Sequence, residues 1–116
     1  MMMEDCIFCQ LVTKKIPGKI EYENDDLLVF WDINPQAPIH LLIIPKKHIA
    51  KLSDFKNEDV HLLGKMMEAA KNCAHKLNLH EKGFRLVLNE GRDSGQSIFH
   101  IHLHLLSGRR LMWPPG

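Results

Sequence analysis

The feature that most constrains this chain is the run His-Ile-His-Leu-His at residues 100–104. Successive side chains of a β-strand alternate between its two faces, so a strand here places three imidazoles on one face and Ile101 and Leu103 on the other. Alternate residues of a strand lie roughly 7 Å apart, close enough for three rings to surround one phosphoryl-sized group. Imidazole is a nucleophile and a proton carrier near neutral pH, so the run predicts a strand with a reactive face of histidines and an apolar face that packs on the core.

Two other interpretations of the run have to be weighed. A single histidine in a sheet usually has a structural role, but three at a strict period of two, followed by Leu105 and Leu106, are hard to assign to packing. Alternating histidines can instead share one metal ion as neutral ligands. From the spacing alone, catalysis and metal binding both stay open.

Length and charge narrow the classes of function. The 116 residues fit one domain, 1–116, with 45% apolar and 25% charged residues. Fifteen basic and fourteen acidic residues give a formal charge of +1, so we expect no broad capture of nucleic acid or of an anionic membrane. No segment approaches the roughly 20 apolar residues that span a bilayer. The N-terminus lacks the apolar stretch of a signal peptide, and three cysteines are an odd set for a disulfide framework, so we expect a cytoplasmic or nuclear location.

Periodicity and chain breakers predict an α+β fold. Apolar residues at helical spacing follow Asp5, a candidate N-cap, and predict a short helix that stops before Pro17 and Gly18. We expect strands at 19–22, 27–32, 39–44, 84–88 and 100–104, with hairpins around 23–26 and through the loop 90–97. The third of these ends at Pro45 and contains His40.

A long helix is expected to start at Ser53 or Asn57 and to reach about Leu77. Its predicted apolar stripe comprises Val60, Leu63, Met67, Ala70, Cys73, Ala74 and Leu77. Met66 and Met67 are interpreted as core filling, because methionine packs irregular gaps well. This helix would cover one face of the sheet and leave the other, with the histidines, open.

The loop before the histidines can deliver donors to an anion. Its glycines permit backbone angles that turn successive amides inward, and Gly95, Gln96 and Ser97 stand closest to the histidine run. Transfer at phosphorus needs fixed donors for the non-bridging oxygens and an in-line nucleophile. The middle histidine, His102, is the predicted nucleophile.

The run 96–106 resembles the signature of the histidine triad superfamily, whose members bind or transfer nucleoside monophosphates. The similarity extends to the segments 31–38, 44–48 and 89–91 and to the ending 113–116. It implies an α+β fold with a five-stranded antiparallel sheet, a short N-terminal helix and one long central helix. It also implies a homodimer in which two sheets join into one of ten strands.

Segment 31–38 and the ending 113–116 resemble the Hint branch of that superfamily, purine nucleoside phosphoramidases that cleave the P–N bond of adenosine monophosphoramidates and also act on aminoacyl adenylates. The resemblance implies this hydrolysis, without a cofactor for the catalytic step. Two alternatives remain: a nucleotide-binding adaptor with incidental hydrolysis, and a dinucleoside polyphosphate hydrolase. The leaving amine and the preference between adenine and guanine are not specified by these motifs.

The resemblance also implies roles for individual residues. His102 accepts the nucleotidyl group, His104 and Ser97 lie beside the phosphate and leaving group, and His40 and His100 orient the nucleophile. Asp32 holds the ribose hydroxyls, and Asn89 lies near the leaving group. The remaining expected nucleotide-binding residues are Ile7, Phe8, Phe30, Trp31, Ile33, Leu42, Gly95, Gln96 and Ile98.

The pair Cys6 and Cys9 departs from the animal Hint pattern and resembles zinc-containing members of the wider superfamily. In those members the other two ligands correspond to His48 and His100. A closed site of this kind would be structural, because a catalytic zinc keeps an open position. Two unligated thiols in a reducing compartment are the alternative.

Overall fold

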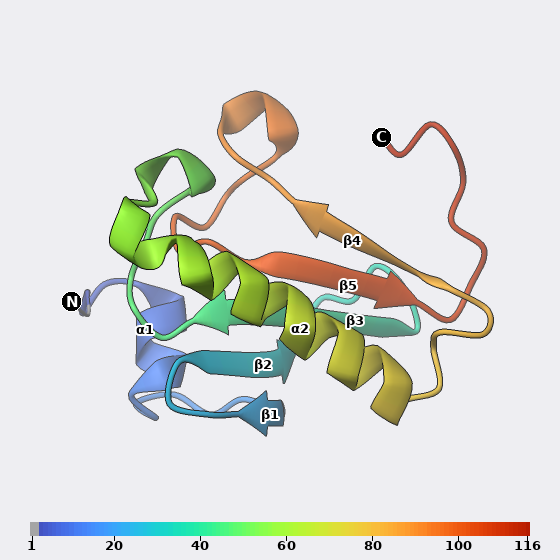
Figure 1. Ribbon diagram of the computed structural model, residues 1–116, viewed down its shortest axis with the longest axis horizontal. Helices are drawn as coiled ribbons and strands as arrows, with labels where there is room; N and C mark the ends of the chain where they lie inside the picture. The colour runs from blue at the N-terminus through green and yellow to red at the C-terminus, as the bar shows by residue number, and fades with distance from the viewer. Residues whose placement is uncertain (1–2) are drawn as a thin grey trace.

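The computed structural model describes residues 3–116, so the first two residues of the expected domain lie outside it. Five antiparallel strands form one sheet in the order β1-β2-β3-β5-β4 (Figure 1). Their bounds are Ile20–Glu23 for β1, Leu27–Trp31 for β2, Ile39–Pro45 for β3, Phe84–Leu88 for β4 and Leu103–Ser107 for β5. The predicted α+β fold and both predicted hairpins are confirmed.

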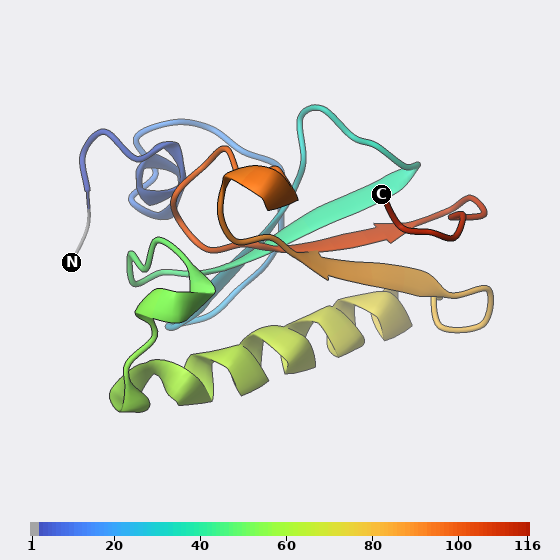
Figure 2. The same ribbon diagram turned by 90° about the horizontal axis from the view of Figure 1, so that it is seen from above.

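Each face of the sheet carries one helix. The long helix α2, Val60–Lys76, covers one face, and the short helix α1, Ile7–Val12, lies on the other (Figure 2). Alternation in β2 supplies both layers, because Leu27 and Val29 pack with α2 whereas Leu28 and Phe30 pack with α1. The central strands are therefore apolar on both faces, which explains their continuous runs of aliphatic residues.

Both helices begin at residues other than those predicted. Cys6, not Asp5, is the N-cap of α1, and its Sγ accepts the N–H of Cys9 at 3.4 Å. Helix α2 is capped at Asp59 instead of Asn57 or Ser53, after two short 3-10 turns, Leu52–Asp54 and Asn57–Asp59. The Asp59 carboxylate accepts from Lys47 Nζ at 2.6 Å, an ion pair that ties the start of the helix to the segment after β3.

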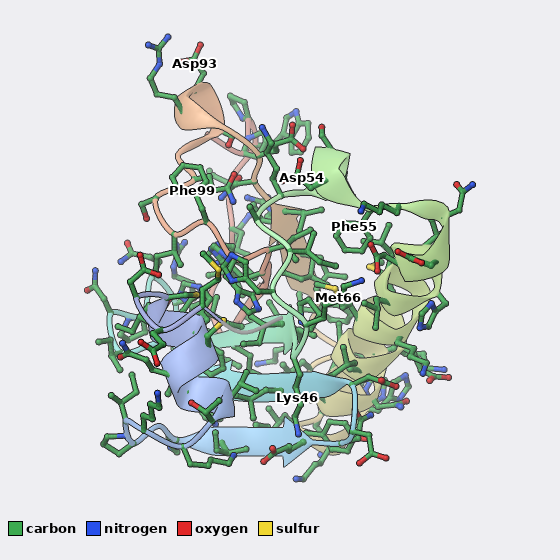
Figure 3. All side chains as sticks on the ribbon, turned by 90° about the vertical axis from the view of Figure 1, so that its left-hand side faces the viewer. Lys46, Asp54, Phe55, Met66, Asp93 and Phe99 are labelled. Carbon is green, nitrogen blue, oxygen red and sulfur yellow. The ribbon has the colours of Figure 1, made fainter. Side chains whose placement is uncertain are left out.

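The buried stripe of α2 is displaced from the predicted one. Met66 is 1% exposed and lies between the helix and the sheet (Figure 3), whereas Val60 and Met67 are 53% and 52% exposed. Leu62 and Ala69 are buried in their place. The first two turns carry apolar residues on two faces, so periodicity permits two phases, and packing against β2 and β3 selects one of them.

The histidine strand also differs from its predicted bounds. Strand β5 starts at Leu103, so His104 is the one histidine of the run inside it. The ladder between β3 and β5 ends at the pair of Ile43 with Leu103. The Ile101 N–H donates to the Ile49 carbonyl instead, at 2.7 Å.

The predicted alternation nevertheless persists through the irregular segment. Ile101, Leu103 and Leu105 are buried on the side of α2. The rings of His100 and His102 lie against Phe8 of α1, with centroids 5.9 and 5.2 Å from it. The three histidines therefore share one face as predicted, but that face is not left open, because α1 lies on part of it.

Candidate active site

A cavity of about 600 Å³ opens on the α1 side of the sheet, between α1, β2, β3 and the segment 95–104. Apolar side chains from α1 and the central strands form one part of it, and polar side chains form the other. The lining residues are Ile7, Phe8, Leu11, Ile16, Pro17, Gly18, Phe30, Trp31, Asp32, Ile33, Asn34, Gln36, His40, Leu42, Gly95, Ser97, Ile98, His102 and His104. Its volume is typical of a small-molecule site.

His102 faces this cavity with one nitrogen free for chemistry. Its Nδ1 lies 2.8 Å from the carbonyl oxygen of His100, which can only accept, so Nδ1 carries the proton. A neutral imidazole has one N–H, and Nε2 therefore keeps its lone pair. The ring is 9% exposed and is held edge to face by Phe8. His100 thus orients His102 through its backbone carbonyl.

His104 and His40 form a hydrogen-bonded pair beside His102. The Gln36 N–H donates to His40 Nδ1 at 3.0 Å, which leaves the proton of neutral His40 on Nε2. That Nε2 lies 2.9 Å from His104 Nδ1 and 3.5 Å from Asp32 Oδ2. His104 Nδ1 therefore accepts, and its own proton sits on Nε2, the nitrogen left for the cavity. His40 contacts His104, not the predicted nucleophile.

The ring of His100 turns towards the two cysteines of α1. Its Nε2 donates to the Pro45 carbonyl at 2.8 Å, and its Nδ1 lies 3.4 Å from Cys6 Sγ and 3.6 Å from Cys9 Sγ. His48 Nδ1 lies 3.3 Å from Cys9 Sγ, and all four ligand atoms fall within 4.8 Å of one another.

This donor set fits zinc. Tetrahedral zinc with Zn–S of about 2.3 Å and Zn–N of about 2.0 Å requires sulfur–nitrogen separations of about 3.5 Å. The three separations between these cysteines and histidines match that value. The Pro45 carbonyl fixes the orientation of the His100 ring, as outer partners do for metal-bound histidines. The four residues that the family resemblance implies as metal ligands therefore meet in the structure.

Burial is the main influence on the histidines of the site. It lowers the pKa of His104 to about 4, helped by the neighbouring His102 and His40 rings, and that of His100 to about 4 as well. Burial also lowers the pKa of His102 and His40, against an opposing effect of Asp32. The rings are therefore neutral at neutral pH.

Two predicted nucleotide-binding residues lie away from the cavity lining. The Gln96 side chain is committed to the loop, because its Oε1 accepts from Gly91 N–H and its Nε2 donates to the Ala50 carbonyl, each at 2.9 Å. Asn89 is half-buried beyond the end of β4. Gly95 does line the cavity, and its φ of +90° is a conformation that favours glycine.

Sequence reasoning missed part of the cavity wall. Pro17 and Gly18 were interpreted only as a helix stop, Leu11 only as part of the first helix, and Asn34 and Gln36 only as part of the segment 31–38, while Ile16 carried no prediction. Trp31 borders the cavity, but its ring packs with the α2 layer, and its Nε1 donates to Glu21 at 3.1 Å. Trp31 therefore contributes to the far face of the sheet more than to the slot.

Comparison with known proteins agrees with this fold. The sequence matches the HIT domain family over residues 13–111, and the chain belongs to that family. It is 49% identical over 115 residues to an uncharacterized HIT-like protein of Synechocystis, covering 99% of this chain and 100% of that one.

Solved structures give the same result. A HIT family hydrolase of Legionella pneumophila superposes with a TM-score of 0.94 at 48% identity, over 97% of this chain and 100% of that one. A HIT family hydrolase of Clostridium thermocellum gives 0.93 at 40% identity, over 96% of each chain. Among residues 3–116, no helix is both long and apolar enough to cross a membrane.

Proposed function

We propose that the protein is a purine nucleoside phosphoramidase of the Hint type, which hydrolyses the P–N bond of adenosine 5′-monophosphoramidates and, with a carboxylate as the leaving group, the P–O bond of aminoacyl adenylates. The observation that carries the proposal is the unprotonated Nε2 of His102. His102 lines the cavity, and the hydrogen bond from its Nδ1 to the His100 carbonyl fixes the orientation of its ring. An imidazole in this state attacks phosphorus without a separate base. The similarity to HIT family hydrolases supports the reaction class.

The reaction proceeds in two displacements. In the first, the His102 Nε2 lone pair forms a bond to phosphorus, and the electron pair of the P–N bond leaves with the amine, which takes a proton from solvent through the Ser97 hydroxyl. In the second, water attacks phosphorus, the electron pair of the Nε2–P bond returns to His102, and a proton is released. The Nε2–H of His104 donates to a non-bridging phosphoryl oxygen in both steps.

The remainder of the cavity suits a purine nucleotide. Phe8, Phe30 and Leu42 offer apolar and aromatic area for the base, where stacking would supply most of the affinity. Asp32 lies at the end of this slot, and a carboxylate can accept from two ribose hydroxyls at once. Both adenine and guanine nucleotides are therefore proposed substrates.

Zinc and a partner chain complete the proposal. Cys6, Cys9, His48 and His100 would hold one structural zinc that braces α1 against the segment after β3, while the reaction itself needs no cofactor. The protein is proposed to form a homodimer through a free edge of its sheet, which ends in β1 on one side and β4 on the other. Sedimentation at micromolar concentration tests for the dimer.

The function is tested with His102→Ala and adenosine 5′-phosphoramidate. Turnover is expected to vanish while binding of adenosine monophosphate persists, because most of the slot remains. His75→Ala is the matched control, since His75 is an exposed histidine in the last turn of α2, on the face of the sheet opposite the site, where its ring stacks on His80 at 4.2 Å. Near-normal turnover by His102→Ala would reject the assignment.

Two results would point to the other functions. Tight nucleotide binding without any covalent nucleotidyl enzyme in a rapid quench would indicate an adaptor. Faster turnover of a dinucleoside polyphosphate than of the phosphoramidate, on one preparation, would indicate a dinucleoside polyphosphate hydrolase.

A further inference from the structure

The loop 32–38 between β2 and β3 supports the His40–His104 pair, and a residue beyond β5 reaches this loop. Arg109 donates to the Gln36 carbonyl oxygen through both Nε, at 3.3 Å, and Nη2, at 3.0 Å. The same Gln36 residue donates its N–H to His40 Nδ1 at 3.0 Å. An exposed arginine is thus two hydrogen bonds away from a buried histidine of the cavity.

The path of the chain explains how Arg109 arrives there. Gly108 has φ +98°, and a Cβ at this position would lie 2.8 Å from the Pro38 Cβ. The backbone after β5 therefore passes directly over the loop 32–38, which only glycine permits. Close passage at Gly108 places the next residue over the Gln36 carbonyl.

We propose that Arg109 is a positioning residue for the reaction: it holds the backbone of Gln36 at its carbonyl, so that the Gln36 N–H fixes the tautomer of His40, and through His40 that of His104. The inference rests on the proposed phosphoramidase function for its kinetic consequence. The Gln36 carbonyl and the Gln36 N–H belong to adjacent peptide groups joined at the Gln36 Cα, so two charge-assisted hydrogen bonds to that carbonyl fix the position from which the N–H points at His40 Nδ1. His40 Nδ1 then stays an acceptor, His40 Nε2–H donates to His104, and His104 presents Nε2–H to the cavity.

Without this hold, the chain of donors has a competing arrangement. When the Gln36 N–H moves away, His40 Nδ1 can carry the proton itself, and His40 Nε2, 2.9 Å from His104 Nδ1, then becomes an acceptor. His104 Nδ1 then loses its donor and can carry the proton itself. In that tautomer His104 offers a lone pair, not a donor, to the phosphoryl oxygen.

The test uses the full chain labelled with ¹⁵N-histidine. Long-range proton–nitrogen spectra report which ring nitrogen is protonated, whether or not the protein turns over a substrate. The wild-type chain is expected to give the Nε2–H form at His40 and His104. Arg109→Ala is expected to give a mixture at both rings and to leave His102 unchanged, since its partner is the His100 carbonyl.

Kinetics with adenosine 5′-phosphoramidate supply the second readout. Arg109→Ala is expected to lower kcat roughly 10- to 100-fold with KM within about twofold, as loss of a supporting hydrogen bond does. Arg109→Lys keeps a charged donor and is expected to recover part of kcat. Arg110→Ala is the matched control, because it removes the neighbouring exposed positive charge, and both readouts are expected to stay at wild-type values.

An unchanged His40 tautomer in Arg109→Ala, or a kcat within about twofold of wild type, would overturn the inference. Absence of turnover in the wild-type chain would overturn the proposed function instead. The nitrogen spectra would then still decide whether Arg109 sets the tautomer of His40.

Discussion

Replacement of adjacent methionines in α2 tests the orientation of the layer beneath the site. Met66 is 1% exposed and contacts the core cluster on β2, β3 and β5, whereas Met67 is 52% exposed. Truncation of a buried methionine to alanine costs about 2–5 kcal/mol through lost burial and the cavity left behind. A loss of about 3 kcal/mol lowers the Tm of a domain of this size by roughly 10–20 °C. Met67→Ala is expected to stay within about 0.5 kcal/mol of wild type, because it loses little burial and alanine favours a helix.

The assay is urea unfolding followed by circular dichroism, with the slope m checked for constancy between variants. Because the two substitutions remove the same atoms from neighbouring positions, the difference between them reports burial alone. Equal losses, or a larger loss for Met67→Ala, would refute the packing described for α2. The second result would restore the stripe that periodicity predicts.

Three other predictions concern the metal site, two glycines and acid stability. Cys9→Ala is expected to abolish the binding of about one zinc ion per chain, measured by elemental analysis. Cys73→Ala, in the α2 core, is the control and is expected to retain the zinc ion. Equal zinc contents in the two variants would contradict the proposed metal site. Gly108→Ala is expected to lower the free energy of unfolding in urea by about 1–3 kcal/mol, because φ is +98° there and the backbone lies against the loop 32–38. Gly64→Ala, in open space on α2, is expected to raise it by about 0.5–1 kcal/mol. A stabilising Gly108→Ala or a destabilising Gly64→Ala would contradict these two assignments. Hydrogen bonding from a lysine holds the pKa of Asp59 below its ordinary 3.8, so its stabilisation is present above that pH and is lost as pH falls through the lowered value. The stabilities of wild type and Asp59→Asn should converge in acid, and a constant difference down to pH 3 would exclude the ion pair as the cause.

Most of the fold could be predicted from local patterns in the sequence. Alternation and chain breakers located all five strands, because strands buried on both faces need long aliphatic runs and end where proline removes a donor. The bounds of the histidine segment were wrong for a non-local reason. The β3–β5 ladder ends at the pair of Ile43 with Leu103, and the Ile101 N–H donates instead to the carbonyl of Ile49, a contact between segments far apart in the sequence.

The site was predicted unevenly for similar reasons. Cys6, Cys9, His48 and His100 meet as expected, because a resemblance to complete proteins carries information about distant contacts. Contacts made by backbone atoms could not be predicted, because a backbone N–H or carbonyl is present whatever the side chain is. The Gln36 N–H on His40 is one of them, so the sequence assigned His40 to the nucleophile although it supports His104.

The stereochemistry of the reaction at phosphorus tests the central claim most directly. An adenosine phosphoramidate made chiral at phosphorus with oxygen isotopes and sulfur, hydrolysed in labelled water, reports how many displacements occur. A nucleotidyl-His102 intermediate requires two in-line displacements, each with inversion, and so predicts net retention of configuration. Net inversion would show that water attacks the substrate directly and would contradict the account.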